Sequence, residues 1–210
     1  MISPGEEILD IFDHDMRWVG TASRADVHRE GYWHQTFHCW VCVQVDGVAH
    51  LVLQLRHPSK DTNPGKLDVS CAGHLSAGER PDDGTRELRE ELGLEVEFAD
   101  LREAGAYREQ SSADGVIDNE YCHIYVYHHR DYTSLHGYRP APDEVSGLYL
   151  VPVRTFAQLC KGEIDQAACS GCIYSEDGSP VPSKRDVRLD DLVHRPAGYY
   201  ELLFNCLKQG

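Results

Sequence analysis

The sequence predicts a single mixed α/β domain that ends in a helical C-terminal extension. Three observations predict this fold class. Strand-like runs recur through residues 6–152, a helical pattern interrupts them at residues 86–94, and no internal repeat or interdomain linker divides the chain. The chain has 210 residues, of which 41% are hydrophobic and 26% charged, so one domain with a sizeable core is expected.

The first part of the chain predicts strands around one short helix. Residues 6–13 form a strand that ends at a turn, and a short helix within residues 21–28 begins after a Ser or Thr cap. The run 33–45 is aromatic and β-branched, as expected for a strand. It is followed by Asp46-Gly47, a strong hairpin turn signal, and by an answering strand at residues 50–55.

The middle of the chain predicts a strand, a loop between glycines and a helix. Residues 67–71 form a further buried strand. Within residues 86–94, Leu88 and Leu92 are four positions apart, which places both on one helix face, and Gly93 stands where a C-terminal cap belongs. We therefore expect a helix that docks through its leucines.

The rest of the chain predicts paired strands and then the extension. Residues 101–109 and 120–128 alternate as paired strands do, and residues 147–152 supply another short strand. Residues 167–184 are rich in Gly, Pro and Ser and are interpreted as a long surface loop or a hairpin insertion. Two further helices are expected, at residues 155–159 and 199–207.

The charge of the chain limits its partners. The formal net charge is −15, from 20 basic and 35 acidic residues, and it repels phosphate backbones and anionic lipid surfaces. We therefore expect neither a nucleic acid polymer nor a membrane as a partner. The N-terminus lacks a positive segment followed by an apolar run, and no stretch approaches about twenty apolar residues, so a cytoplasmic protein is expected.

The eight cysteines are scattered, and several lie in strand-like runs. This distribution is typical of reduced, buried thiols rather than of a disulfide framework. Cys169 and Cys172 form the only CxxC pair. A zinc site would need two more ligands at plausible spacing, so a plain loop or a chance pairing is the favoured interpretation.

The helix at residues 86–94 carries a cluster of carboxylates. Glu87, Glu90 and Glu91 have the i, i+3 and i+4 spacing that places all three on one face, away from the leucines. Like charges at that spacing repel each other, and a solvated helix face is the plain alternative. A divalent cation explains the cluster better, because clustered carboxylates bind hard cations. Gly73 and Gly78 allow the preceding backbone to turn toward a ligand.

This segment resembles the Nudix box, written G-x5-E-x7-R-E-U-x-E-E-x-G-U with U an aliphatic residue. Gly73, Glu79 and the run Arg86-Glu87-Leu88-Arg89-Glu90-Glu91-Leu92-Gly93-Leu94 match it. There is one departure: six residues separate Glu79 from Arg86, where the family pattern has seven. The deletion lies in the loop before the helix, so it affects the placement of Glu79 and leaves the acidic face unchanged.

The resemblance implies an α/β/α sandwich around a mixed sheet, with a Nudix domain at residues 1–155 and an extension at residues 156–210 packed on it. It also implies a pyrophosphohydrolase that acts with Mg²⁺ or Mn²⁺ on a small-molecule diphosphate, such as a nucleoside diphosphate derivative, and a homodimer by family analogy. Arg86 would orient a glutamate, and the base would be a helix glutamate or an acid on another loop. The implied catalytic residues are Glu91, Glu87 and Arg86, and the implied metal ligands are Glu87, Glu90, Glu91, Gly73 and Glu120.

A second resemblance offers an alternative. Residues 26–40, 72–74 and 118–121 are similar to the Nudix branch related to isopentenyl diphosphate isomerase. That resemblance implies a metal site near His28, His34, His74, Asp118 and Glu120. It also implies a catalytic cysteine directly before Gly73, where this chain has Ala72, and Cys71 would point to the opposite face of a strand. The helix glutamates are complete, so a hydrolase is favoured over an isomerase or a catalytically silent binding module.

The substrate-binding residues are predicted less directly. Arg56 and Lys60 are expected to meet phosphate, and His34 and His74 to contact substrate or metal, although packed histidines are the plain alternative. Asp143-Glu144 is a weaker acid candidate, since acids before edge strands are often only solvated. Three aromatic residues could stack on a nucleotide base, and burial in the core is the equal alternative: Trp33, Tyr107 and Tyr121.

Overall fold

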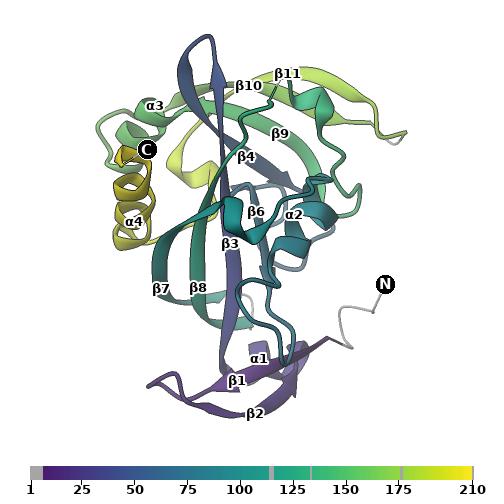
Figure 1. Ribbon diagram of the computed structural model, residues 1–210, viewed down its shortest axis with the longest axis vertical. Helices are drawn as coiled ribbons and strands as arrows, with labels where there is room; N and C mark the ends of the chain where they lie inside the picture. The colour runs from purple at the N-terminus through teal and green to yellow at the C-terminus, as the bar shows by residue number, and fades with distance from the viewer. Residues whose placement is uncertain (1–6, 114–115, 133, 176, 210) are drawn as a thin grey trace.

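The computed structural model describes residues 7–113, 116–132, 134–175 and 177–209, in which eleven strands form one sheet and four α-helices pack on it (Figure 1). The strands are β1 (Ile8–Phe12), β2 (Trp18–Ser23), β3 (Trp33–Val45), β4 (Val48–Arg56), β5 (Leu67–Asp68), β6 (Cys71–His74), β7 (Leu101–Ala113), β8 (Val116–His128), β9 (Val145–Pro152), β10 (Ala167–Tyr174) and β11 (Pro180–Val187). The helices are α1 (Arg24–Glu30), α2 (Thr85–Leu92), α3 (Val153–Cys160) and α4 (Ala197–Lys208).

Strand β3 organises the sheet. It pairs in parallel with β8 along residues 33–42, and antiparallel with β6 at residues 36–39 and with β4 at residues 42–45. The sheet is therefore mixed, as the sequence resemblance implied. Residues of β3 are buried almost continuously, because both faces of the strand are covered by other elements.

Two hydrophobic cores lie on opposite faces of the sheet. Trp40 and Cys42 of β3 join the core that α3 and α4 cover, whereas Phe37 and Val41 join the core that α2 covers. This alternation follows from the period of two along a strand. The predicted layered α/β/α arrangement is therefore correct.

Local signals set the helix ends that matter for the site. Ser23 accepts a hydrogen bond from the Asp26 N–H and begins α1. Gly93 ends α2 in the left-handed conformation at φ 68°, and its N–H donates to the carbonyls of the last turn. Leu88 and Leu92 are fully buried, so α2 docks through its leucines as predicted.

Two sequence-based expectations need correction. The segment 67–71 is divided between β5 and β6, because Val69 and Ser70 turn away between them. Strand β2 was not predicted at all. Of the two interpretations of residues 167–184, the hairpin is confirmed: β10 and β11 pair and extend the sheet from β9, so the C-terminal extension is helical only in part.

The CxxC pair does not form a metal site. Cys169 belongs to the core under α4 and Cys172 to the core under α2, since residues three apart on a strand point to opposite faces. All eight cysteines lie within the described residues and are free thiols, as expected. Among the described helices, none has the length and apolar character needed to cross a membrane.

Candidate active site

Helix α2 presents two of its glutamates inward, against the end of β6. Glu87 and Glu91 are 9% and 6% exposed, whereas the side chain of Glu90 is 53% exposed. A Cβ atom at Gly73 would lie 2.2 Å from Cδ of Glu87. Position 73 must therefore be glycine for the Glu87 carboxylate to occupy this place. The structure brings Gly73, Glu87 and Glu91 together and leaves Glu90 at the rim.

Arg86 fixes the carboxylates around it. Its guanidinium donates to both oxygens of Glu79, at 2.8 and 2.9 Å, and to Glu87 Oε1 at 2.6 Å and Glu90 Oε2 at 3.3 Å. It also donates to the carbonyl of His74 at 3.0 Å. Although the loop is one residue shorter than in the family pattern, Glu79 still forms a bidentate contact with Arg86.

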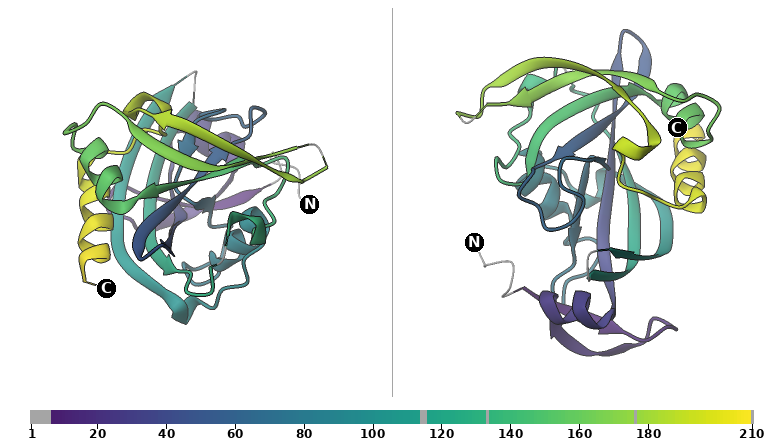
Figure 2. Two further views of the ribbon diagram at one scale, coloured as in Figure 1. Left: turned by 90° about the horizontal axis from the view of Figure 1, so that it is seen from above. Right: turned by 180° about the vertical axis from the view of Figure 1, so that it is seen from behind.

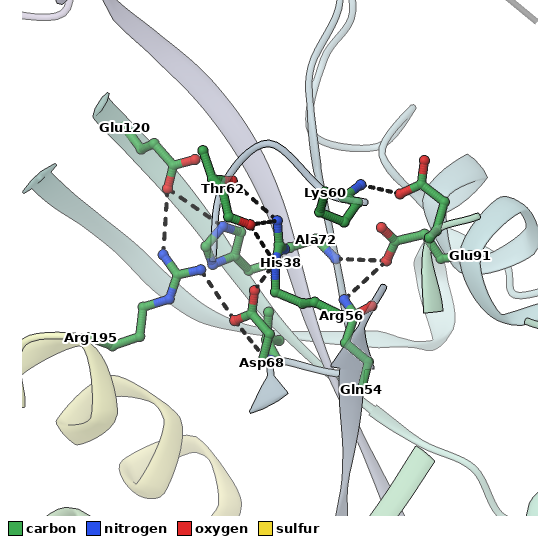
Figure 3. Close-up of polar contacts among 12 residues, drawn as sticks. His38, Gln54, Arg56, Lys60, Thr62, Asp68, Ala72, Glu91, Glu120 and Arg195 are labelled. Atoms are coloured by element: carbon green, nitrogen blue, oxygen red, sulfur yellow. Dashed lines mark hydrogen bonds and ion pairs between the residues drawn. The ribbon is translucent and has the colours of Figure 1, made fainter. Parts of the chain in front are cut away.

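Glu91 is held from the opposite side by β4 and β6 (Figure 3). The Ala72 N–H and the Gln54 amide donate to Glu91 Oε2 at 3.2 and 3.3 Å. Burial raises the pKa of Glu91 and that of Glu87, and each carboxylate lies near other acids that repel its charge. A buried pair of carboxylates of this kind favours a bound cation, which removes the repulsion.

The two predicted phosphate ligands have acidic partners. Lys60 forms an ion pair with Glu144, which comes from the segment before β9. Lys60 also lies near Glu91, where its charge partly offsets the rise in the pKa of that carboxyl caused by burial (Figure 3). Arg56 donates to Asp68 Oδ2 at 3.2 Å and to the carbonyl of Thr62 at 2.9 Å. Lys60 therefore lies at the α2 carboxylates, whereas Arg56 is turned toward β5.

A second cluster lies on the other side of His74. The imidazole rings of His28, His34 and His74 have centroids 5.1 to 5.3 Å apart. Asp118 Oδ1 lies 3.5 Å from His34 Nε2 and 3.7 Å from His28 Nε2. Donor atoms of His34, Asp118 and Glu120 also lie within 4.8 Å of one another. The predicted grouping of these side chains is present; we call it the histidine cluster, comprising His28, His34, His74, Asp118 and Glu120.

The histidine cluster places hydrogen-bond acceptors opposite one another. His34 Nδ1 lies 3.1 Å from the Tyr32 carbonyl, so the proton of the neutral ring belongs on Nδ1 and Nε2 keeps its lone pair. Burial lowers the pKa of His34 to about 3 and that of His28 to about 4, which keeps both rings neutral. Within the described chain, the Nε2 atoms of both rings and Asp118 Oδ1 are buried without a hydrogen-bond partner.

These donor sets fit divalent cations. A cation between two imidazole nitrogens and a carboxylate oxygen would satisfy atoms that are otherwise costly to bury. The α2 carboxylates offer oxygen ligands, which suit Mg²⁺ or Mn²⁺, whereas the imidazoles of the histidine cluster suit metals such as Zn²⁺ and Fe²⁺.

Several residues near the site were missed by sequence reasoning. Arg195, from the segment before α4, lies 2.9 Å from Glu109. It also lies 3.5 Å from Glu120 and 3.4 Å from Asp68 (Figure 3). Gln54, which holds Glu91, was also missed. These residues have no motif around them, and 75 to 127 positions separate Arg195 from its partners. The sequence gives one weak signal: Gln54 and Asp68 are polar residues within predicted strands, where a buried polar side chain needs a partner.

Comparison with known proteins identifies the family. Residues 34–168 match the family model described as NUDIX domain. The chain belongs to the Nudix family. It is 39% identical over 202 residues to an uncharacterised Nudix hydrolase of Clostridium acetobutylicum, a match that covers 96% of this chain and 97% of that one. This similarity over nearly the whole length supports a Nudix enzyme of the pyrophosphohydrolase type.

Other relatives are less similar. The Nudix chain is 35% identical over 123 residues to an isopentenyl-diphosphate Delta-isomerase of Mycolicibacterium vanbaalenii, covering 57% of this chain and 65% of the isomerase. A crystal structure from Deinococcus radiodurans has a TM-score of 0.55 at 23% identity, with 74% of this chain and 90% of that chain covered. A MutT/nudix family protein from Enterococcus faecalis has a TM-score of 0.52 at 10% identity, covering 83% of this chain and 61% of that chain. Both structures support the fold.

Proposed function

We propose that this Nudix protein is a metal-dependent hydrolase that cleaves the diphosphate linkage of a nucleoside diphosphate derivative or a related organic diphosphate. The observation that carries the proposal is the complete acidic face of α2, with Glu87 and Glu91 buried against Gly73 and ordered by Arg86. When bound there, Mg²⁺ or Mn²⁺ would neutralise charge on the substrate phosphates and lower the pKa of a water molecule.

The chain's own residues would perform the remaining tasks. Glu87 and Glu91 hold the cation, with Glu90 at the rim and the Gly73 backbone beside them. Arg86 keeps Glu87 in place through its short contact. A carboxylate at this position takes the proton of the attacking water, and Glu91 is our candidate because its Oε2 accepts from the Ala72 N–H and the Gln54 amide and, among the described residues, forms no ion pair. Glu144, beside Lys60, is the acid on another loop that remains an alternative base.

Substrate contacts are assigned by position. Lys60 lies beside the α2 carboxylates, so we propose that its ammonium leaves Glu144 to contact the substrate phosphates. Arg56 would have to leave Asp68 and Thr62 to do the same, which makes it the weaker phosphate ligand. His34 and His74 belong to the histidine cluster, where we propose that Glu120 contributes to a second cation site.

An isomerase-like reaction is the second candidate. It is favoured by the histidine cluster and by the similarity to isopentenyl-diphosphate isomerases. Against it, Ala72 occupies the place where the resemblance implies a cysteine, and Cys71 points into the core on the other face of β6. The helix glutamates needed for hydrolysis are all present. Hydrolysis therefore accounts for more of the site.

A turnover screen tests the proposal. The protein is incubated with Mg²⁺ or Mn²⁺ and a panel of nucleoside diphosphates, nucleotide sugars, dinucleotides, thiamine diphosphate and isopentenyl diphosphate, and the products are read by mass spectrometry. We expect cleavage between phosphates that falls about 10²- to 10⁴-fold in Glu91→Gln. The matched control is Glu95→Gln, an exposed acid just beyond α2, which should keep its rate. Conversion of isopentenyl diphosphate without cleavage would establish the second candidate instead.

The remaining expectations have their own measurement. A silent binding module would bind Mn²⁺ and phosphate compounds without turnover of any panel member. The homodimer implied by family analogy remains a proposal, and light scattering coupled to size-exclusion chromatography gives the mass directly. A monomer at micromolar concentration would reject it.

A further inference from the structure

Arg195 is a buried cation that the family match leaves out. The match ends at residue 168, and Arg195 lies beyond it, between β11 and α4. Its side chain is 10% exposed, and its guanidinium faces carboxylates from three strands: Asp68 of β5, Glu109 of β7 and Glu120 of β8. Burying a guanidinium has a desolvation cost, which these carboxylates offset.

The protein holds Arg195 rigidly in this place. Residues before it run beside β5, where Leu67 and Leu192 form a bridge and the Val193 N–H donates to the Leu67 carbonyl at 2.7 Å. The guanidinium carbon lies 5.4 Å from the ring centre of Tyr199, a cation–π distance. The Tyr199 hydroxyl in turn accepts from Trp40 Nε1 at 3.2 Å and lies 2.9 Å from His38 Nδ1.

The contacts of Glu120 are all made by one of its oxygens. Arg195 Nη1 lies 3.5 Å from Glu120 Oε2, His38 Nε2 lies 3.9 Å from the same oxygen, and the Cys122 thiol is 3.5 Å from it. Among the described residues, these contacts leave the other oxygen, Oε1, without an ion pair or hydrogen bond, and one oxygen of Glu120 lies within 4.8 Å of ligand atoms of His34 and Asp118. Figure 3 shows Arg195 and His38 meeting Glu120 from the side of α4.

The charge balance leaves room for a cation. Two guanidinium groups, those of Arg56 and Arg195, form ion pairs with three carboxylates: Asp68, Glu109 and Glu120. Asp118 adds a further carboxylate in the histidine cluster. Arg195 thus offsets enough negative charge to keep Glu120 buried without neutralising the cluster.

We propose that Arg195 is a positioning residue that holds the Glu120 carboxylate toward the histidine cluster, so that the C-terminal segment completes a divalent cation site formed mainly by the Nudix domain. This inference rests on the cation-binding part of the proposed function and does not depend on hydrolysis. Neighbours that orient metal ligands typically change metal affinity about 10- to 100-fold when removed.

Titration with Co²⁺, followed by visible absorption in the full-length protein, tests this role. Co²⁺ binds imidazole nitrogen in preference to carboxylate oxygen alone. The visible absorption of bound Co²⁺ is therefore expected to report the histidine cluster rather than the α2 carboxylates. We expect Arg195→Met to weaken Co²⁺ binding about 10- to 100-fold, and Arg195→Lys, which keeps the charge without the planar fork, to lose less. Arg185→Met is the matched control, because Arg185, in the extension, also contacts an aromatic ring, that of Tyr149, and an acid, Asp191, away from the site.

A double-mutant cycle separates positioning from general stability. If Arg195 acts through Glu120, Arg195→Met should add little further loss of Co²⁺ affinity in a Glu120→Gln background. Circular dichroism confirms folding, and if Arg195→Met does not fold, Arg195→Lys is used in the same cycle. Unchanged Co²⁺ affinity in a folded Arg195 variant, or equal losses in both backgrounds, would overturn the proposal. Absence of hydrolysis with this pattern intact would contradict only the proposed function.

Discussion

Individual side chains around His74 decide what the site can bind. Arg86 reaches the His74 carbonyl from the side of α2, while the His74 imidazole belongs to the histidine cluster. One residue therefore joins the α2 carboxylates to a group of neutral imidazoles. Buried lone pairs opposite one another, as at His34 Nε2 and Asp118 Oδ1, need a proton or a cation between them. Both parts of the site thus favour positive ligands.

Gly73→Ala tests the close packing of Glu87. The added Cβ would lie 2.2 Å from Cδ of Glu87, so the carboxylate must move. We expect the specificity constant for the substrate found by the screen to fall about 10²-fold, as for a displaced catalytic group, while the far-ultraviolet circular dichroism is unchanged. Gly137→Ala is the control, because a Cβ there meets open space. Full activity in Gly73→Ala would show that Glu87 does not need this position.

Asp68 gives a prediction for pH. Burial alone would raise its pKa, but Arg195 and Arg56 hold it below the ordinary value of 3.8. A carboxyl group whose pKa is lower in the folded protein than in the unfolded chain stabilises the fold at pH values above the pKa of the unfolded chain. This stabilisation is lost as the pH falls through the pKa of the folded protein. We expect Asp68→Asn to lower the unfolding free energy at pH 7 by about 3 kcal/mol, and the gap to shrink below about pH 4.

Urea denaturation between pH 3 and pH 7 measures this gap. The control is Asp190→Asn at an exposed position, where the change should stay within about 0.5 kcal/mol at every pH. A gap for Asp68→Asn that stays constant across the range would exclude ionisation of Asp68 as its source.

Helix α2 is the element on which the proposed chemistry depends. Its leucines pack into the core beneath the sheet, and the same docking turns Glu87 and Glu91 toward β6. At Gly84, before the first turn, a Cβ would lie 2.4 Å from the Phe37 ring, so the helix also approaches β3 closely at its start. The position of the carboxylates is therefore set by packing on the opposite face of the helix.

Leu88→Ala should loosen this docking. Leu88 is fully buried, and truncation of a buried leucine costs about 2–5 kcal/mol. We expect a loss of that size in urea denaturation, together with weaker Mn²⁺ binding by the α2 carboxylates. Leu189→Ala, at a position 44% exposed, should change stability by less than about 0.5 kcal/mol. Equal effects of the two variants would be inconsistent with the packing described.

The elements that sequence reasoning found are those with strong local signals. Strand β3 matches its predicted bounds because its apolar run ends at the Asp46-Gly47 turn, and Gly93 marked the end of α2. Strand β2 lacks such a pattern, since Gly20 and mostly exposed positions interrupt it. The histidine cluster was expected through family resemblance. Arg195 was not, because only the fold brings it to Glu120, 75 residues away in sequence.

At the scale of the whole molecule, the extension is part of the fold. Residues of α3 and α4 fill the core on one face of the sheet, where Phe156 packs against Tyr200 and Trp40. Hairpin β10–β11 continues the sheet beyond β9. Figure 2 shows α4 lying along the outside of β7 and β8. The described residues of the extension therefore share a core with the strands that precede them.

A chain ending at residue 155 should not fold. This chain would lack four residues that fill the core on one face of the sheet: Phe156, Tyr199, Tyr200 and Leu203. The core would be exposed there, and α4 would no longer cover β7. We expect no cooperative thermal transition by circular dichroism and strong binding of a hydrophobic dye, in contrast to the full chain. A cooperative transition in the shortened chain would show that residues 1–155 are an independent domain.

The most direct test of the account is isotope incorporation from water. The substrate identified by the screen is converted in H₂¹⁸O with Mg²⁺ or Mn²⁺, and the products are weighed by mass spectrometry. The account requires one ¹⁸O atom in a phosphate-containing fragment of each cleavage, and loss of this labelled product in Glu91→Gln. A product of unchanged mass without label, or equal labelling by wild type and Glu91→Gln, would contradict hydrolysis at the α2 carboxylates.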